Sequence, residues 1–184
     1  MSRLRIFSES DPSVPLFATT EHPRIAAELA DQGIRFESWP LHALPFGASP
    51  EQTITAYRPQ IDALMQEKGY QAVDVVSLVP DHPDREAMRQ KFLNEHTHSE
   101  DEVRFFVAGS GLFTLHLGER VFEVLCEAGD LIGVPDGTRH WFDMGPTPHF
   151  IAIRVFTNPA GWVASFTGSD IAGRFPRYEA GQAA

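Results

Sequence analysis

The hydrophobic pattern changes near the middle of the chain. Beyond His98, apolar residues gather in short segments rich in β-branched and aromatic residues, and Gly, Pro and Asp lie between them. Short segments at such regular spacing are typical of strands in an all-β barrel or sandwich. The predicted strands are VRFFVA, LFTLHL, RVFEVLC, DLIGVP, HWFDM and FIAIRVF, and the predicted turns are GSG, GE, EAGD, PDGTR and GPTP.

The first half mixes helical and extended patterns. Ile25, Ala26 and Leu29 recur at helical spacing, with Pro23 near the start of their segment and Gly33 just past its end. IRFESW and AVDVVSLV are typical of strands, and DREAMRQKFLNE is predicted to be a helix that leads into a pair of histidines.

Two more helices are predicted between these strands. Ser49, Pro50 and Gln52 form a capping-box pattern that starts the first of them. Pro59 interrupts this helix, and the piece that follows ends at Gly69. The fold class is therefore mainly β, with several N-terminal helices.

The length of 184 residues suffices for one domain with a sizeable core. Within it we expect a mixed α/β part over about residues 1–93, a barrel with the candidate site over 94–157, and a C-terminal extension over 158–184.

Charge and composition limit the partners and the cellular compartment that we expect for this protein. The net charge of −10, with no basic run, argues against nucleic acid. Cys126 is the single cysteine, which excludes an internal disulfide and favours a reducing compartment; we expect it to be a small buried hydrophobe. The start lacks the apolar region of a signal peptide, and no apolar run approaches the roughly 20 residues of a membrane span. We expect a cytoplasmic monomer that does not associate with membranes.

The stretch NEHTHSEDEVRFF, residues 94–106, places ionisable side chains in front of an apolar run. His96, His98, Glu102 and Arg104 all have even numbers, so in an extended chain they share one face. The odd-numbered positions from Val103 to 107 would then point into an apolar layer. Two imidazoles and a carboxylate form the donor set of a non-haem Fe(II) site, although imidazole also suits Ni, Cu and Zn. An HxH pair alone is more often incidental than a metal site.

A further ligand is expected from another strand. His140 lies in PDGTRHWF, where Pro135 and Gly137 build a tight turn before the strand begins. Glu95 and Asp101 are candidates to accept a hydrogen bond from a ligating histidine, and solvated acidic positions are the alternative. The other histidines are expected to be solvated or hydrogen-bonded: His22, His42, His82, His116 and His149.

Two segments resemble the paired motifs of the cupin superfamily. HTHSEDEVRFFVAG fits HxHxxxExxxxxxG, and GDLIGVPDGTRH fits GxxxxxPxGxxH. Cupins are double-stranded β-helix, jelly-roll-like barrels with a metal inside. Gln90 and Met144 depart from the usual glycine and asparagine near these motifs, and neither is a ligand position. The ligands that the resemblance implies are His96, His98, Glu102 and His140.

A longer resemblance leads to one family of cupins. FLNEHTHSEDEVRFFVAGSGLFTLH and VPDGTRHWFDMG are similar to the acireductone dioxygenases of methionine salvage, and LPFGASPEQTITAYRPQID fits their bacterial members. The resemblance implies an oxidoreductase with one Fe(II) or Ni(II) per chain, which cleaves 1,2-dihydroxy-3-keto-5-methylthiopentene with O2. With Fe(II) the implied products are formate and 4-methylthio-2-oxobutanoate, the precursor of methionine. With Ni(II) they are CO, formate and 3-methylthiopropanoate.

The same resemblance suggests roles around the metal. Arg104, which carries an obligate positive charge, is expected to stabilise the substrate dianion. The thioether tail requires an apolar wall, for which Phe92, Phe142 and Trp162 are candidates, with plain core packing as the alternative. Phe142 shares the parity of His140, and Arg154 is a candidate partner for a substrate oxygen or an acidic side chain.

Other functions use the same motifs. They are a metal-dependent cupin isomerase or decarboxylase, a different O2-using cupin, and a cofactor-free cupin that binds a small molecule. Retention of all implied ligands argues against the binding module. Release of CO or formate from an acireductone would separate the family named from the other enzymes.

Overall fold

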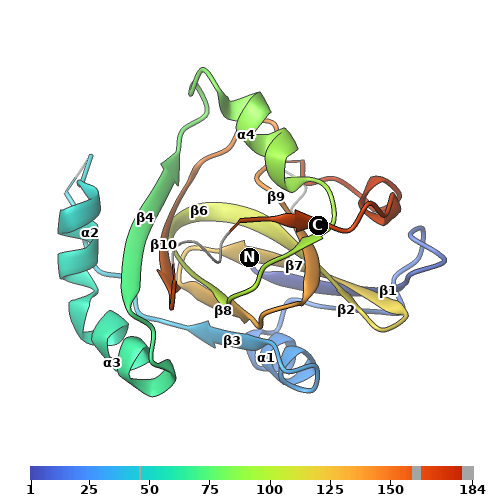
Figure 1. The fold of residues 1–184 in the computed structure, drawn as a ribbon, viewed down its shortest axis with the longest axis horizontal. Coiled ribbons are helices and arrows are strands. Elements are labelled where there is room, and N and C mark those ends of the chain that lie inside the picture. Colours follow the sequence, from blue (N-terminus) through green and yellow to red (C-terminus); the bar gives the residue numbers. More distant parts are fainter. Residues whose placement is uncertain (46, 159–162, 180–184) are drawn as a thin grey trace.

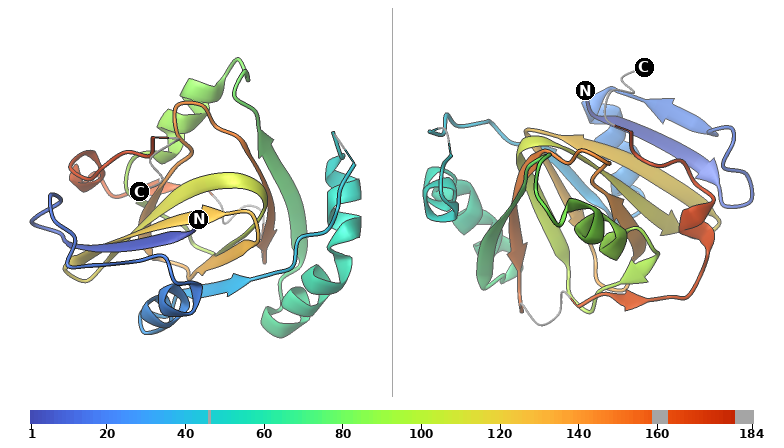
Figure 2. Two further views of the ribbon diagram at one scale, coloured as in Figure 1. Left: turned by 180° about the vertical axis from the view of Figure 1, so that it is seen from behind. Right: turned by 90° about the horizontal axis from the view of Figure 1, so that it is seen from above.

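One long strand, β6 (Glu102–Leu117), belongs to two sheets at once (Figure 1). The computed structural model describes residues 1–45, 47–158 and 163–179. The first half of β6 pairs with β8 (Asp130–Val134) and β10 (Phe150–Phe156). Its second half pairs with β7 (Arg120–Glu127) and β9 (Arg139–Asp143). The two sheets therefore share β6 and enclose a barrel, as Figure 2 shows from two further sides.

Strands from the N-terminal part extend both sheets. β3 (Arg35–Ser38) pairs with β8, and β4 (Ala72–Leu78) pairs with β10. β1 (Arg3–Ser8) pairs with β7 along its whole length and carries β2 (Phe17–Thr19) on its other side. The hydrophobic pattern predicts β3 and β4 but not β1, whose short apolar run is interrupted by arginines. The N-terminal part is thus hydrogen-bonded into the barrel.

The turn predicted at GSG is wrong, because β6 runs through it without a break. Gly109 has φ +69°, and a Cβ atom there would lie 1.7 Å from the carbonyl oxygen of His149. The glycine therefore lets β6 bend against β10 rather than reverse. Just before it, Phe106 pairs with Ala152 and residue 108 with residue 151, so the ladder contains a bulge.

The bulge changes which residues of β6 face the barrel interior. In the first half the even-numbered Glu102, Arg104 and Phe106 face inward, whereas in the second half Phe113 and Leu115 do so. The parity predicted for the candidate site thus holds up to the bulge and reverses beyond it.

In the described part of the chain, four α-helices cover the barrel from outside. They are α1 (His22–Ala30), α2 (Pro50–Ala56), α3 (Arg58–Lys68) and α4 (Arg85–Phe92). The predicted capping box is present, with Ser49 accepting from the backbone N–H of Gln52, and Gly69 ends α3 in the left-handed conformation. In Figure 1, α2 and α3 lie beside β4, α1 lies below β3, and α4 lies above the barrel. Within the described residues, no helix is long and apolar enough to cross a membrane.

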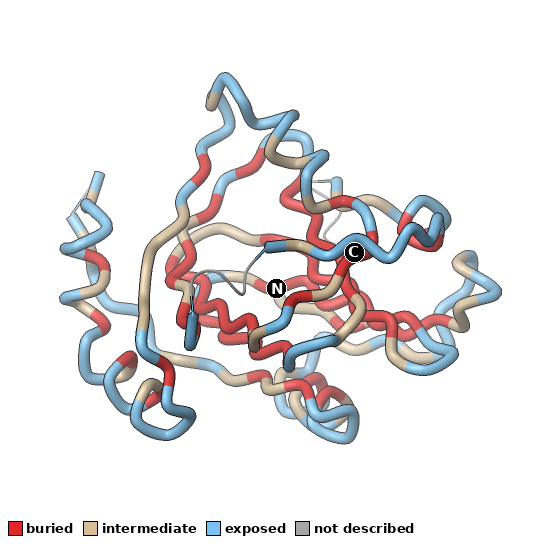
Figure 3. The backbone as a smooth tube through the Cα atoms, viewed as in Figure 1, coloured by how far each residue is buried: buried red, intermediate tan, exposed pale blue. Residues whose placement is uncertain are grey.

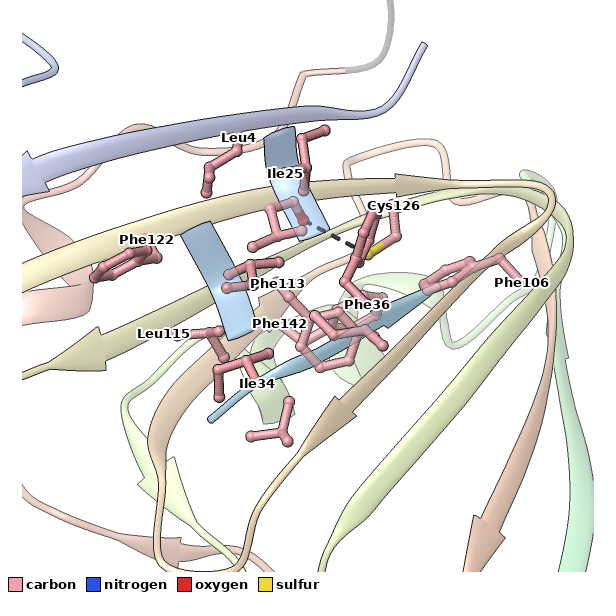
Figure 4. Close-up of a cluster of buried hydrophobic side chains, with 14 of the residues drawn as sticks. Leu4, Ile25, Ile34, Phe36, Phe106, Phe113, Leu115, Phe122, Cys126 and Phe142 are labelled. Atoms are coloured by element: carbon pink, nitrogen blue, oxygen red, sulfur yellow. Dashed lines mark hydrogen bonds between the residues drawn. The ribbon is translucent and has the colours of Figure 1, made fainter. Parts of the chain in front are cut away.

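Buried side chains form an interior core and two outer layers. The interior core includes Phe106, Phe113 and Phe142, and Cys126 is fully buried in it, as the sequence analysis predicts (Figure 4). In one outer layer, Phe105 packs with residues of α3 and its flanks, which confirms the apolar layer predicted opposite the candidate ligands. In Figure 3 the buried residues follow the barrel strands, while much of the helical surface is exposed.

The second outer layer is formed by the C-terminal segment. β11 (Ser165–Phe166) pairs with β5 (His96–Thr97), and the short helix η2 (Ile171–Gly173) follows. Ile171 and Phe175 pack on Trp141 of β9, which lies on the outer side of that sheet. The C-terminal segment is thereby fixed across the sheet that carries His140.

We predict that Gly109→Ala will destabilise the protein by roughly 2–4 kcal/mol, because the new methyl group meets the His149 carbonyl and the residue keeps a positive φ. Gly118→Ala is the matched control, since Gly118 has φ +61° with no atom within 4 Å of its added Cβ. It should lose only roughly 1–2 kcal/mol. Urea unfolding of both variants measures the difference, and equal losses would show that β6 does not need the close approach.

Candidate metal centre

Three histidine side chains converge at one end of the barrel. His96 lies on β5, His98 follows it, and His140 lies opposite His96 on β9. Their ring centroids are 4.5 to 5.1 Å apart, and one ring nitrogen from each lies within 4.8 Å of the others. All three are buried. The β5–β9 pairing thus brings two distant motifs to one point.

Each histidine directs its Nδ1 atom to a backbone carbonyl oxygen. This hydrogen bond keeps one ring proton on Nδ1, so that Nε2 faces the cluster and has a lone pair for a metal once it carries no proton. The acceptors are Asn94 for His96 at 2.7 Å, Thr138 for His140 at 2.8 Å and Val163 for His98 at 3.4 Å.

The turn before β9 also fixes His98. The backbone N–H of Gly137 donates to the carbonyl oxygen of His98 at 2.9 Å, and Asp101 accepts from the N–H of Asp136 at 3.1 Å. The tight turn predicted from Pro135 and Gly137 therefore sets the position of His98 as well as the start of the His140 strand.

Glu102 completes the group from the start of β6. Its Oε2 atom lies 3.1 Å from Nε2 of His140 and 3.2 Å from Nε2 of His98, and its Oε1 atom lies 2.7 Å from Nε of Arg104. Burial alone would raise the pKa of this carboxyl, but Arg104 and the two imidazoles outweigh it and hold the pKa well below its usual range. Glu102 is therefore a carboxylate although it is buried.

Burial also acts on His96. It lowers the pKa of this imidazole to about 4, and neighbouring His140 acts in the same direction. His96 is consequently neutral at neutral pH, which is the form that binds metals.

Arg104 is stacked inside the barrel. Its guanidinium carbon lies 4.7 Å from the ring centre of Phe142 and 5.2 Å from that of Phe113. Burial lowers the pKa of Arg104 and Glu102 opposes this, yet a guanidinium remains charged at any physiological pH. Arg104 also lies opposite Arg154 in the β6–β10 ladder. The β4 partner of Arg154 is Asp74, whose Oδ1 accepts from Nε of Arg154 at 2.7 Å.

A cavity of about 420 Å³ lies next to the histidines. Its lining includes His98 and three cations, Lys91, Arg104 and Arg154. The rest of the lining is apolar and includes Phe92 of α4 and Phe166 of β11, with Val163 and Ala164 beside them. A ligand in this cavity would meet positive charge and an apolar wall at the same time.

The candidate aromatic residues lie in different places. Phe92 lines the cavity, with its ring centre 6.4 Å from that of His96. Phe142 faces the barrel interior as its parity predicts, but it packs on Phe113 and Phe150 beneath Arg104 and is not part of the described cavity lining. Trp162 lies outside the described residues. Sequence reasoning missed Phe166, because a strand of two residues has no periodicity to reveal it.

The two acidic candidates have other partners. Glu95 lies 2.6 Å from Nδ1 of His116, and Asp101 accepts from the hydroxyl of Tyr70 at 3.0 Å. Neither of them accepts from the ring of His96, His98 or His140, since backbone carbonyl oxygens take that place. The expectation that the other histidines are hydrogen-bonded is confirmed for four of them: His22, His42, His82 and His116.

The donor set fits a transition metal. Imidazole nitrogens and one carboxylate suit Fe, Ni, Cu and Zn better than Mg or Ca, which prefer oxygen ligands. His98 takes part in both the cluster and the cavity lining, so a metal held here would be reached from the cavity.

The low pKa of His96 predicts a pH-dependent stability of the metal-free protein. The unfolded chain protonates this residue near pH 6.5 and the folded protein only near pH 4, so between these values the unfolded state binds more protons. The free energy of unfolding should therefore decrease as the pH falls through this window, with a contribution of up to about 1.4 kcal/mol per pH unit.

Urea unfolding of chelator-treated protein between pH 7 and pH 4 measures this slope. His96→Asn keeps a donor for the Asn94 carbonyl but cannot titrate, so its slope should be smaller. Identical slopes for the two proteins would show that His96 is not held neutral by the fold.

Comparisons with known proteins agree with this geometry. The sequence model of the ARD/ARD' family matches residues 3–164. The acireductone dioxygenase of Xanthomonas axonopodis pv. citri is 59% identical over 179 residues, which cover 97% of this chain and 95% of that protein. The acireductone dioxygenase of Pseudomonas fluorescens is 59% identical over 180 residues, which cover 97% of this chain and 99% of that protein.

A solved structure extends the agreement to the fold. Acireductone dioxygenase from Bacillus anthracis, with a cadmium ion in its active center, matches with a TM-score of 0.81 at 29% identity. The match covers 90% of this chain and 98% of that one, and it confirms the mainly β cupin fold predicted from the sequence. The chain therefore belongs to the acireductone dioxygenase family.

Proposed function

We propose that this protein is a metal-dependent dioxygenase that cleaves the acireductone 1,2-dihydroxy-3-keto-5-methylthiopentene with O2 in methionine salvage. One observation carries the proposal: three buried imidazoles and an ionised carboxylate meet beside a cavity that also contains Arg104. The names of the relatives, acireductone dioxygenase, support the choice of substrate over those of other metal-dependent cupins.

His96, His98, His140 and Glu102 would hold one Fe(II) or Ni(II) ion per chain. When bound, such an ion supplies Lewis acidity, which lowers the pKa of the hydroxyl groups that coordinate it. The hydrogen bonds from Nδ1 to backbone carbonyls keep the imidazoles oriented before the metal arrives. Glu102 can turn from the two imidazoles to a metal without a change in its charge.

Arg104 would stabilise the substrate dianion. Its charge is held at the cavity by the contact with Glu102 and by stacking on Phe142. A fixed cation away from bulk water stabilises developing negative charge at little reorganisation cost. Phe142 therefore supports Arg104 from beneath instead of contacting the substrate.

The cavity is suited to the rest of the substrate. Its volume of about 420 Å³ falls in the range of roughly 300–1,000 Å³ typical of small-molecule sites. Phe92 and Phe166 would form the apolar wall for the thioether tail, and Arg154, steadied by Asp74, would contact a substrate oxygen. We also infer that the protein acts as a monomer in the cytoplasm, since its single cysteine suits a reducing compartment.

Exchange of the metal should change the products of one and the same protein. Metal-free protein is reconstituted with Fe(II) or Ni(II), mixed with the acireductone and O2, and its gases and acids are identified. With Fe(II) we expect formate and 4-methylthio-2-oxobutanoate, and with Ni(II) we expect CO, formate and 3-methylthiopropanoate. No O2 uptake with either metal would contradict the proposed function, and one product set for both metals would contradict control by the metal.

Arg104→Ala should keep its metal and lose activity by roughly a hundredfold or more, because the dianion loses its charged partner. A guanidinium has no lone pair for a metal, and a bound metal ion would itself supply positive charge next to Glu102, so the metal content should not change. Arg104→Lys should recover only part of the rate, since a point charge cannot reproduce the planar fork. Arg24→Ala, which removes an exposed arginine of α1, is the control. Wild-type O2 uptake by metal-replete Arg104→Ala would exclude this role.

A further inference from the structure

His116 lies between two carboxylates, on the outer side of the sheet that contains β9. Its Nδ1 atom lies 2.6 Å from Oε2 of Glu95, and its Nε2 atom lies 2.8 Å from Oε2 of Glu9. The side chains of His116 and Glu95 are 5% and 1% exposed, whereas that of Glu9 is 43% exposed. The inner contact of His116 is therefore shielded from water and the outer one is not.

Both contacts have the imidazole as the donor when the carboxylates are ionised. An ionised carboxylate only accepts hydrogen bonds, so a ring nitrogen of His116 that bonds to it is the donor. Such charge-assisted hydrogen bonds are short and strong, especially where water is excluded. The Glu95 contact is thus a firm anchor between β6 and the residue that precedes β5.

Glu95 is held from a second side by the C-terminal segment. The hydroxyl of Thr167 donates to Oε1 of Glu95 at 2.7 Å, and the backbone N–H of Thr167 donates to the Glu95 carbonyl at 3.1 Å. Both carboxylate oxygens and the main chain of Glu95 therefore have fixed partners.

The strand that follows Glu95 has few contacts with the barrel. β5 contains only His96 and Thr97, and it pairs with β9 at a single register position, between His96 and His140. Its other neighbour is the two-residue strand β11, which pairs with both of its residues and leads directly into Thr167. The acceptor for Nδ1 of His96 is the carbonyl of Asn94, on the other side of Glu95. A shift of Glu95 would therefore move both the backbone of His96 and the carbonyl that orients its ring.

We propose that His116 is a positioning residue of the metal centre, which acts through Glu95 to hold His96 in place. The inference rests on the proposed metal centre. Groups that orient a metal ligand without touching the metal typically contribute roughly 10- to 100-fold to metal affinity. His116 would do so by way of the main chain rather than by a bond to the ligand ring.

Two amide substitutions separate the two contacts of His116. The amide nitrogen of Asn takes the place of Nδ1, so His116→Asn keeps the donor to Glu95 and loses the one to Glu9. The amide nitrogen of Gln takes the place of Nε2, so His116→Gln keeps the donor to Glu9 and loses the one to Glu95. The two variants therefore differ in which of the two contacts they remove.

The affinity for Ni(II) is measured by competition with a chromophoric chelator, and the ligand field by the visible spectrum of the Co(II)-loaded protein. His116→Gln should bind Ni(II) roughly 10- to 100-fold more weakly than wild type and show a shifted Co(II) spectrum. His116→Asn and Glu9→Gln should stay near wild type in both. Glu123→Gln is the stability control, because Glu123 is buried on β7 and pairs with Arg5 instead.

The outcomes test the positioning role of His116 separately from the existence of the metal centre. Equal Ni(II) affinity and equal Co(II) spectra for folded His116→Asn, His116→Gln and wild type would overturn the positioning role. A wild-type protein that binds no Ni(II) would overturn the metal centre on which it rests. If His116→Gln does not fold, Thr167→Val decides, since it loosens Glu95 from the opposite side and should also weaken Ni(II) binding. Unchanged binding in that variant would contradict the proposal.

Discussion

The Glu102 carboxylate, ionised inside a barrel of apolar side chains, is the constraint on which the rest of the site depends. A buried carboxylate without partners is strongly unfavourable, and a protein stabilises it only by placing positive charge and hydrogen-bond donors around it. Here Arg104 contacts one oxygen, and His98 and His140 contact the other. Arg104 is itself buried and needs Glu102 and the two phenyl rings in return. The negative charge of Glu102 therefore orders the site before any metal binds, and the same charge would pair with a bound metal ion.

The double role of β6 makes this arrangement possible. The half of β6 before Gly109 directs Glu102 and Arg104 into the barrel and pairs with β10, which brings Arg154 to the same cavity. The half beyond it carries Phe113 beneath Arg104 and turns His116 to the outer side, where Glu95 lies. In a straight strand, the even-numbered His116 would point to the same side as Glu102 and Arg104. Because of the bulge and the bend at Gly109, the same strand carries side chains of the site on its inner side and His116, which contacts Glu95, on its outer side.

The local parts of this structure could be predicted from the sequence, and the long-range parts could not. The capping box at Ser49, the end of α3 at Gly69 and the shared face of Glu102 and Arg104 follow from neighbouring residues alone. By contrast, the continuation of β6 through GSG depends on the backbone at His149, much further along the chain. The contact of Glu95 with His116 depends on the reversed parity of β6. The ligand residues were identified by motif resemblance, whereas Phe166 enters the cavity only through the pairing of β11 with β5.

A crystal structure of the Ni(II)-loaded protein, with anomalous scattering recorded at the nickel edge, tests the central claim most directly. The account predicts one anomalous peak per chain, bonded to Nε2 of His96, His98 and His140 and to a carboxylate oxygen of Glu102. It also predicts that Arg104 remains stacked on Phe142 beside the metal. A peak elsewhere, or a nickel ion that leaves Glu102 in contact with the imidazoles alone, would contradict it.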